Sequence, residues 1–480
     1  MTAQMLIDGE WIASEGGGTF ETIDPASGEV IELVPDATAT DVDAAVAAAK
    51  AAFSSPEWAQ MLPATRARLL WRIADLLEEH SEELARLETR DQGQPFGISS
   101  AISIPNAVEH FRYSAGWATK LHRVTVPLSI PGVDYRNRRE PLGVCGLIMP
   151  WNFPLMIAAW KLAPALVTGN TVVMKPAEQT PLSTIRLAQL CMEAGVPRGV
   201  INVVTGGPAV GQAIVRHRDV AKISFTGSTE VGREIASEAG RRLARVSLEL
   251  GGKAPSIITP EADIDAILEG NLMGGLLNCG QVCAAYTRFY VDHKRADEFA
   301  QKMGTIASGM KLGNGLEPTT QLGPLVSEDQ LQRVDRYVSA GVAEGATLVT
   351  GGSRAGGELA TGYFYQPTVF TNVTDSMTIA REEIFGPVLS VIPYEDPQEL
   401  AGRANDTDYG LAAVIWSRDI GTANRLAHEI NAGTVWINLP PFLDAAAPWG
   451  GMKASGVGRE MGWEAILAYT DIKSIWTSLT

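Results

Sequence analysis

The chain is poor in cysteine, histidine and basic charge, and each shortage excludes a class of function. Its four cysteines, Cys145, Cys191, Cys279 and Cys283, are too few and too unevenly spaced for a disulfide framework, so we expect reduced thiols in a cytoplasmic protein. The six histidines are scattered and no Cys/His cluster has ligand spacing, so no metal is expected. A formal net charge of −16 argues against a nucleic-acid partner, because phosphate contacts need clustered Lys and Arg.

Little in the sequence places the chain in a membrane. The N-terminal segment MTAQMLIDGEWIASEGGG lacks a basic region followed by a sustained apolar run, so we do not expect a signal peptide. The most apolar stretch, residues 142–165, is interrupted by Asn152, Lys161 and three prolines, whereas a spanning helix needs roughly 20 predominantly apolar residues. We expect a buried strand, a turn and a helix there, and no membrane partner.

What the chain does have is length and periodic patterning. At 480 residues with 45% apolar residues, it can bury a large core and exceeds the usual size of one domain. Residues 40–53 combine an N-cap candidate, Thr40, with acidic residues in the first turn and helical spacing, which predicts a surface helix. Residues 65–88 repeat the 3.6-residue period, which predicts one longer helix ending before Gly93 and Pro95.

After Pro141 the pattern changes to short β-rich runs such as GVCGLIM, TVVMK and KISFTG, which alternate with helical segments. Strands separated by crossover helices predict a parallel sheet with helices on both faces, so the fold class is α/β. A similar alternation after Gly251 predicts a second α/β domain. Residues 121–140 alternate without a helical pattern and could form an arm, with residues 469–476 as its strand partner.

Three segments offer groups for covalent chemistry. Cys283 in NCGQVCAAYTR could be a nucleophile, although a free cysteine is more often a buried, inert residue. Glu249 ends an apolar run in LELGGK and is followed by two glycines that permit close approach, yet it could also be a solvated strand end. Asn152 in PWNFP carries an amide that could donate to an oxyanion or simply cap a turn.

Three further segments suit a phosphorylated, ribose-bearing ligand. Lys175 and Glu178 in KPAEQTP follow a strand and could grip a ribose, or form an ordinary exposed pair. FTGSTEVG, residues 225–232, opens a helix whose first N–H groups attract phosphate, although it is not the GxGxxG fingerprint. EEIFGPV, residues 382–388, combines an acidic pair, an aromatic residue and a glycine.

In this order and spacing, the six segments closely resemble the aldehyde dehydrogenase superfamily. The resemblance extends over nearly the whole chain, from LIDGEWIAS to PWGGMKASGVGRE. It implies a Rossmann-like NAD-binding domain (residues 1–120 and 141–250), an α/β catalytic domain (251–455), and a small β oligomerisation arm with the C-terminal tail (121–140 and 456–480). It also implies a homodimer or homotetramer in which the arm extends a neighbour's sheet.

The resemblance implies a thioester mechanism that oxidises an aldehyde to the acid. Cys283 is the expected nucleophile, and the Asn152 amide with the Cys283 N–H would hold the oxyanion. Glu249 is the expected general base, which activates water for thioester hydrolysis. The presence of Glu249 argues against a CoA-dependent acylating enzyme, and the presence of all three residues argues against a catalytically silent binding homologue.

The cofactor implied is NAD, with NADP as the alternative. Glu178 would accept hydrogen bonds from a ribose 2′-OH but repel a 2′-phosphate, so NAD should be preferred. By resemblance, Lys175 and Glu178 grip the adenosine ribose, Gly227 and Ser228 form the pyrophosphate site, Gly207 and Gly211 lie along the adenine cleft, and Glu383 and Phe385 hold the nicotinamide riboside. Further cofactor-binding candidates are Ile148, Pro150, Trp151, Phe225, Val231, Leu250 and Gly251.

Candidates for the substrate pocket follow PWNFP and lie in the loop NLPPFLDAAAPWGG: Phe153, Ile157, Trp160, Leu443, Asp444 and Trp449. Plain core packing explains each aromatic residue equally well. An apolar, aromatic entrance favours a hydrophobic or aromatic aldehyde, and LD followed by PWGG is similar to phenylacetaldehyde-type relatives. There are two alternatives: an aromatic cage for a quaternary ammonium group, as in betaine-aldehyde enzymes, and a pocket for a semialdehyde.

Two departures from the family pattern affect these expectations. Cys279, four residues before Cys283, could form a regulatory disulfide, although an unpaired packing residue is the simpler interpretation. Pro440 and Pro441 stiffen a loop that shapes the substrate mouth, which weakens any substrate carried over from a relative.

Overall fold

A computed structural model describes residues 3–480, and its largest sheet has eight strands in the order β19-β11-β10-β7-β8-β9-β1-β2. The five central strands are parallel, while β1, β2 and β19 add antiparallel pairs at the two edges. The strands are β1 (Met5–Ile7), β2 (Glu10–Ile12), β7 (Val144–Ile148), β8 (Thr171–Lys175), β9 (Ile201–Val203), β10 (Val220–Thr226), β11 (Arg245–Glu249) and β19 (Gly456–Val457).

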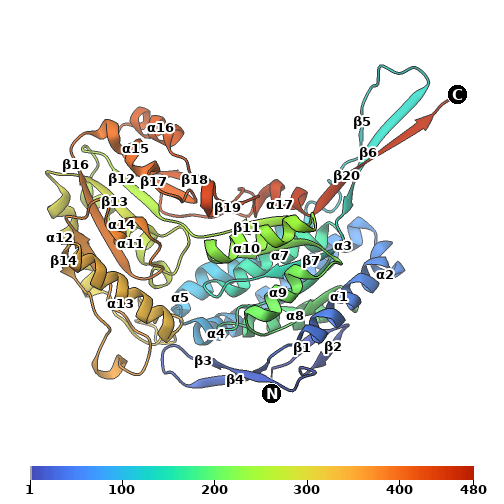
Figure 1. The fold of residues 1–480 in the computed structure, drawn as a ribbon, viewed down its shortest axis with the longest axis horizontal. Helices are drawn as coiled ribbons and strands as arrows, with labels where there is room; N and C mark the ends of the chain where they lie inside the picture. Colours follow the sequence, from blue (N-terminus) through green and yellow to red (C-terminus); the bar gives the residue numbers. More distant parts are fainter. Residues whose placement is uncertain (1–2) are drawn as a thin grey trace.

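Helices cover both faces of this sheet, as Figure 1 shows. The helices of this part of the chain are α1 (Ala39–Ser54), α2 (Pro56–Ala59), α3 (Pro63–Glu79), α4 (Ser81–Gln92), α5 (Phe96–Ile98), α6 (Ile104–Ala115), α7 (Pro154–Val167), α8 (Leu182–Glu193), α9 (Pro208–Arg216), α10 (Thr229–Arg241) and α17 (Gly462–Ala468).

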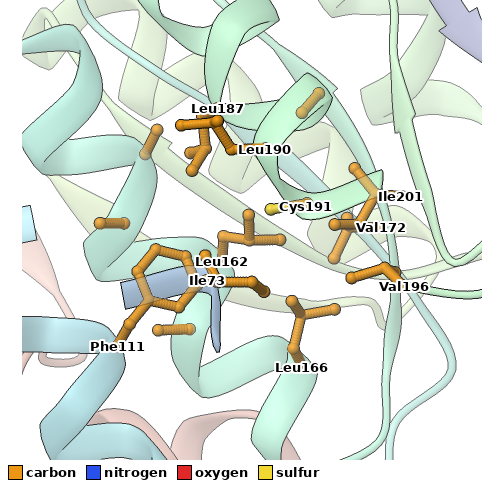
Figure 2. Packing of buried hydrophobic residues seen from close by; sticks show 14 of the residues in the cluster. Ile73, Phe111, Leu162, Leu166, Val172, Leu187, Leu190, Cys191, Val196 and Ile201 are labelled. Atoms are coloured by element: carbon orange, nitrogen blue, oxygen red, sulfur yellow. The ribbon is translucent and has the colours of Figure 1, made fainter. Parts of the chain in front are cut away.

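The most enclosed of these helices is α7, of which every residue is buried. Leu162 and Leu166 of α7 pack with Phe111 of α6 and with Leu187 of α8 in one apolar cluster (Figure 2). Burial at this density fixes the position of a helix, because a fully packed core has no room for alternative registers. The loop that precedes α7 is therefore held on a rigid support.

The second sheet has seven strands in the order β14-β15-β16-β13-β12-β17-β18, parallel except for the β14–β15 pair. Its strands are β12 (Ala254–Ile258), β13 (Tyr286–Asp292), β14 (Thr347–Thr350), β15 (Thr368–Thr371), β16 (Val388–Tyr394), β17 (Ala412–Trp416) and β18 (Thr434–Ile437). The helices of this part are α11 (Ile264–Leu276), α12 (Ala296–Gly309), α13 (Glu328–Ala343), α14 (Thr378–Arg381), α15 (Leu400–Asn405) and α16 (Ile420–Glu429). The α/β fold class predicted from the sequence is confirmed.

A three-stranded sheet projects from the body as an arm (Figure 1). It consists of β5 (Val124–Thr125), β6 (Val133–Pro141) and β20 (Thr470–Ser478), in the order β20-β6-β5. The tail strand β20 pairs antiparallel with β6 along its whole length, so the predicted strand partner is confirmed. A separate hairpin is formed by β3 (Thr19–Ile23) and β4 (Val30–Pro35).

Two helix predictions need correction. Helix α1 is capped by Thr38 rather than Thr40: the Thr38 hydroxyl accepts from the Asp41 N–H, and the Asp41 carboxylate accepts from the Thr38 N–H. The predicted helix over residues 65–88 is two helices, α3 and α4, which meet at His80. The segment around His80 contains neither glycine nor proline, so no breaker residue marks the break in the sequence.

The apolar stretch over residues 142–165 is strand β7, a loop and most of α7, as predicted. Among residues 3–480, no helix has the length and apolar character needed to cross a membrane.

Candidate active site

Cys283 lies in the irregular segment between α11 and β13. The chain leaves α11 through a single 3₁₀ turn, Leu277–Gly280, in which Asn278 and Cys279 both have left-handed backbone angles, with φ of 48° and 56°. Such conformations are strained for residues with a Cβ and persist where surrounding contacts enforce them. They carry the partly buried Cys283 to the wall of a cavity.

Hydrogen bonds tie this segment to the loop before α7. The Asn152 side-chain amide donates to the Gln281 carbonyl at 2.9 Å, and the Asn152 carbonyl accepts from the Asn278 amide at 2.8 Å. Gln281 is held in turn by donating to the Asn278 carbonyl and accepting from the Val326 N–H. An asparagine amide carries two hydrogens, so one of the Asn152 hydrogens remains available for a ligand oxygen.

Glu249 is the last residue of β11, and its side chain is almost completely enclosed, at 3% exposure. Neither of its carboxylate oxygens has a hydrogen-bond partner within residues 3–480. Burial, reinforced by the negative charge of Glu460, raises the pKa of Glu249 well above its ordinary value, while Lys161 and Arg459 oppose the rise. A buried carboxyl with unused oxygens and a raised pKa is typical of a general acid or base.

The positive charge near Glu249 belongs to a buried cluster. The Lys161 ammonium of α7 is paired with the Glu460 carboxylate and donates to the Thr226 hydroxyl at 2.8 Å and to the Ser224 hydroxyl at 3.2 Å. Lys161 and Glu460 are both fully buried, so the pair neutralises charges that neither could carry alone in this interior.

The thiol of Cys283 does not have the lowered pKa of a preformed thiolate. Burial, together with the negative charges of Glu383 and Glu249, raises its pKa to about 12. A thiol with this pKa is neutral at pH 7, so attack on a carbonyl requires removal of its proton.

A cavity of about 380 Å³ joins these three groups, because Cys283, Asn152 and Glu249 all line it. Every candidate for the substrate pocket lines the same cavity: Phe153, Ile157, Trp160, Leu443, Asp444 and Trp449. The cavity also receives residues that the sequence analysis did not single out, including Met156, Thr226, Trp436 and Phe442.

Aromatic side chains in this cavity are fixed by hydrogen bonds. The Trp160 indole N–H donates to the Asn106 amide oxygen at 2.7 Å, and the Trp436 indole N–H donates to the Phe442 carbonyl at 3.2 Å. The rings of Trp436 and Trp449 pack with their centroids 6.1 Å apart. The outer wall adds two exposed carboxylates, those of Glu109 and Asp444.

The proposed cofactor residues gather where the strands of the first sheet end. Ile148 is in register with Lys175 of β8 on one side and with Phe225 of β10 on the other. After β7 the chain builds β8 and β9 on one side and then returns to build β10 and β11 on the other. In open α/β sheets, ligands bind at the carboxyl ends of strands where the order reverses in this way.

At the end of β8, the Lys175 ammonium contacts the Glu178 carboxylate at 3.3 Å and donates to the Pro176 carbonyl at 3.1 Å. Gly211 of α9 lies against the same lysine, because a Cβ on this glycine would be 3.6 Å from the Lys175 Cδ. Burial lowers the pKa of Lys175. The Glu178 side chain is 36% exposed, so its carboxylate is open to a ligand.

Two helix starts face the same region. Gly207 is the N-cap of α9, and a Cβ built on it would meet no atom within 4 Å. Ser228 caps α10 by accepting from the N–H of Val231, whose side chain is exposed. Gly227 lies against Phe225, because a Cβ on this glycine would be 2.4 Å from the Phe225 ring and would force the ring to shift.

The segment EEIFGPV contacts the end of β11. The Glu383 carboxylate accepts from the Gly252 N–H at 2.8 Å, and a Cβ on Gly251 would lie 2.4 Å from that carboxylate. Burial raises the pKa of Glu383 to about 7. Phe385 packs edge-on against Trp151 with ring centroids 5.1 Å apart. Three predicted segments therefore meet here, while Leu250 is buried behind them and Pro150 is half-buried.

Comparison with known proteins identifies this architecture. The model of the aldehyde dehydrogenase family matches residues 11–475. The chain belongs to the aldehyde dehydrogenase family, an aldehyde-oxidising group of oxidoreductases.

Individual relatives of this aldehyde dehydrogenase are similar over their whole length. A phenylacetaldehyde dehydrogenase of Pseudomonas fluorescens is 46% identical, over 98% of this chain and 95% of the relative. An NAD⁺ complex of a Bacillus cereus aldehyde dehydrogenase is 47% identical with a TM-score of 0.98, over 100% of this chain and 97% of that one. A betaine aldehyde dehydrogenase of Staphylococcus aureus in complex with NAD⁺ is 42% identical, also with a TM-score of 0.98, over 100% and 96%.

Sequence reasoning missed several residues of this aldehyde dehydrogenase's site. Met156 lies on the same helical face as Phe153, Ile157 and Trp160, so the i, i+3, i+4, i+7 spacing could have found it. Lys161 and Glu460 lie far apart in the sequence and meet only in the fold, so no local signal marks them.

Proposed function

We propose that this enzyme oxidises a hydrophobic or aromatic aldehyde to the carboxylic acid with NAD, through a thioester on Cys283. The observation that carries the proposal is the shared cavity, into which the neutral thiol of Cys283, the free amide hydrogen of Asn152 and the unpartnered carboxyl of Glu249 all open. These are the nucleophile, the oxyanion donor and the proton acceptor that a thioester mechanism requires.

The reaction begins when the Cys283 sulfur bonds to the aldehyde carbon and the thiol proton is released to solvent, which leaves the Glu249 carboxylate free for the later step. The carbonyl oxygen becomes an oxyanion, held by the Asn152 amide and the Cys283 N–H. NAD held by the residues at the strand ends would supply the acceptor for the hydride that leaves the same carbon. Glu249 then takes a proton from water, and the hydroxide adds to the thioester carbon. The carbon–sulfur bond breaks to release the acid, and Glu249 returns its proton to the leaving sulfur, which restores the thiol and the carboxylate.

The residues at the strand ends form the donor set that NAD needs. Glu178 offers an exposed carboxylate to ribose hydroxyls, and Lys175 beside it offers an ammonium. The open space over Gly207 and the start of α10 at Ser228 suit a pyrophosphate, because helix N-termini attract anions. Glu383 and Phe385 would hold the nicotinamide riboside. The named NAD⁺ complexes of relatives with TM-scores of 0.98 support the same cofactor.

A preference for NAD over NADP follows from the charge at Glu178. Its carboxylate accepts hydrogen bonds from a 2′-hydroxyl but repels a 2′-phosphate. The neighbouring Lys175 is already engaged by Glu178 and the Pro176 carbonyl, which leaves little positive charge for a second phosphate.

The substrate class follows from the cavity wall. Phe153, Trp160, Trp436, Phe442 and Trp449 supply aromatic faces, and the aliphatic residues between them exclude water. A large apolar substrate gains more from such a wall than a small or anionic one. The relative named phenylacetaldehyde dehydrogenase supports an aromatic aldehyde.

A second candidate substrate is an aldehyde that carries a cationic amine. The carboxylates of Glu109 and Asp444 lie on the outer wall, and the indoles of Trp160 and Trp449 lie deeper. This combination attracts an ammonium group through charge and cation–π contacts. The neighbour named betaine aldehyde dehydrogenase supports this alternative.

We also propose that the chain assembles as a homodimer or homotetramer through the arm. The strand β20 is an edge strand, and the arm exposes large apolar side chains: Val124, Val126, Ile130, Ile472, Trp476 and Leu479. An exposed apolar edge strand is a template for pairing with another chain.

The test is NADH formation by wild-type protein and Cys283→Ala against aliphatic, aromatic, amino and semialdehyde substrates. We expect aromatic aldehydes to give the highest kcat/KM and the variant to be inactive with all of them. Activity retained by Cys283→Ala would refute the thioester mechanism, and a preference for amine-bearing aldehydes would select the second candidate.

A further inference from the structure

Helix α4 carries two carboxylates that the reaction does not use. Glu88 and Asp91 lie three residues apart, so they project from the same side of the helix. Both are enclosed, with exposures of 0% and 1%. Burying a carboxylate is costly unless hydrogen bonds replace its water, so the partners of these two groups are informative.

Glu88 holds the start of α7. One of its oxygens accepts from the Leu155 N–H at 2.7 Å, and the other accepts from the Gln94 amide at 2.9 Å. The N-cap of α7, Phe153, provides no side-chain cap, and Pro154 has no N–H to satisfy. Glu88 therefore supplies the cap that α7 lacks.

Asp91 does the same for α8. One of its oxygens accepts from the Leu182 N–H at 2.9 Å, and the other accepts from the Thr22 hydroxyl at 3.0 Å. Leu182 is the first residue of α8, and the N-cap Pro181 makes no side-chain hydrogen bond to the helix.

Each capped helix begins directly after a loop of the active site. Asn152, the oxyanion donor, lies three residues before Leu155, on the short loop between β7 and α7. Lys175 is the last residue of β8, and Glu178 lies on the loop between β8 and α8. A cap restrains the residues that enter a helix, so each carboxylate acts on the loop that precedes its helix.

We infer that Glu88 is a positioning residue for the Asn152 oxyanion donor and that Asp91 is a positioning residue for the Lys175–Glu178 ribose grip. Two carboxylates on one face of α4 thus hold the oxyanion donor and the cofactor-binding pair in position, each through its own hydrogen bond to a helix start. This inference rests on the proposed function, which assigns the roles of Asn152, Lys175 and Glu178.

The two carboxylates are not wholly independent. The Ser183 hydroxyl of α8 also donates to Glu88, at 3.3 Å. This bond is longer than the Leu155 bond and comes from a flexible hydroxyl, so its loss should have the smaller effect. A Ser183→Ala variant removes it and leaves both helix caps in place.

The test measures the two ends separately, with readouts that do not depend on turnover of the NAD-loaded enzyme. Acylation of Cys283 is followed with p-nitrophenyl acetate, whose ester carbonyl forms the same oxyanion and releases nitrophenolate without NAD. Cofactor affinity is followed by quenching of tryptophan fluorescence during NAD titration.

We expect Glu88→Ala to slow acylation about 10- to 100-fold and to leave the Kd of NAD within about twofold, because a displaced oxyanion donor mainly affects the chemical step. Glu88→Gln retains an acceptor for the Leu155 N–H and should fall between Glu88→Ala and wild type. Asp91→Ala should raise the Kd of NAD about tenfold with acylation near the wild-type rate. Glu82→Ala, which removes an exposed carboxylate of the same helix, should change neither value.

The inference is overturned if folded Glu88 and Asp91 variants keep both wild-type values. It is also overturned if both variants slow acylation and raise the Kd of NAD in equal proportion, as a purely structural role would predict. If the alanine variants do not fold, the acylation rate and the Kd of NAD are compared in Glu88→Gln and Asp91→Asn instead, where smaller changes in the same direction are expected. Asn152→Ala distinguishes failure of the proposed function from failure of the positioning role. If this variant acylates at the wild-type rate, the proposed function fails. If it acylates slowly while the Glu88 variants acylate normally, only the positioning role is refuted.

Discussion

The backbone of Gly252 lies against the backbone of Cys283, so closely that a Cβ on Gly252 would sit 2.2 Å from the Cys283 carbonyl oxygen. The two glycines of LELGGK thus have different neighbours, since a Cβ on Gly251 would meet the Glu383 carboxylate instead. The close contact joins the strand that ends at Glu249 to the segment that carries the nucleophile.

Gly252→Ala should therefore displace Cys283. Backbone atoms cannot yield as a flexible side chain can, so the segment must shift, and we expect kcat to fall about 100-fold, as a displacement of about 1 Å can cause. The check is steady-state NADH formation together with the acylation burst. Gly240→Ala, at an exposed helical position with nothing within 4 Å of the added Cβ, is the matched control and should retain full activity.

Glu249→Gln should separate the two halves of the reaction. The amide cannot accept a proton, so thioester hydrolysis should slow by about 10²- to 10⁴-fold while one equivalent of NADH still forms in a burst. Mass spectrometry should find the acyl group on the peptide that contains Cys283. An absent burst with a good aromatic substrate would contradict the role given to Glu249.

The pH dependence of wild-type hydrolysis should carry the signature of the same group. Only the deprotonated carboxylate is a base, and burial raises the pKa of Glu249, so the rate should rise with pH over a range displaced above that of an ordinary glutamate. This rise of the hydrolysis rate with pH should be absent in Glu249→Gln. A wild-type rate that is already maximal at pH 5 would contradict the raised pKa.

The sequence predicted the fold class, the central strands and the arm pairing because each depends on local patterning or on a family-wide motif. The helix break at His80 was not predicted because no breaker residue marks it. The cap at Thr38 was not predicted because Thr38 and Thr40 offer equivalent signals in the sequence. The Lys161–Glu460 pair and the helix caps from Glu88 and Asp91 depend on contacts between distant segments, which a single sequence does not reveal. The domain boundaries, the cytoplasmic location and a redox role for Cys279 stay predictions.

Glu178→Gln should weaken the discrimination against NADP. Removing the negative charge removes its repulsion of a 2′-phosphate, so we expect kcat/KM for NADP relative to NAD to rise about tenfold, the change that follows from about 1.4 kcal/mol. Glu193→Gln, an exposed charge change at the far end of α8, should leave the ratio unaltered. Equal changes in both variants would indicate a general effect of net charge.

Phe442→Ala should lower the preference for aromatic aldehydes. Phe442 lines the cavity yet is 58% exposed, so its loss should not disturb the core. We expect kcat/KM for phenylacetaldehyde to fall about tenfold and that for acetaldehyde to change little, because only the larger substrate reaches the lost apolar surface. A parallel fall with both aldehydes would exclude Phe442 from substrate selection, and Leu62→Ala, an exposed apolar residue outside the cavity, is the control.

The burial of Glu88 should also affect stability in a way that pH reveals. Burial raises the pKa of Glu88 to about 7, so between pH 4.5 and 7 the folded state holds a proton at Glu88 that the unfolded state has released. Stability from this group is therefore greatest at low pH and declines as pH rises through that range, by at most roughly 3 kcal/mol at pH 8. Glu88→Gln does not ionise, so its melting temperature relative to wild type should be higher at pH 8 than at pH 5. A difference that stays constant from pH 5 to pH 8 would mean that Glu88 keeps its charge throughout, held by the start of α7 alone.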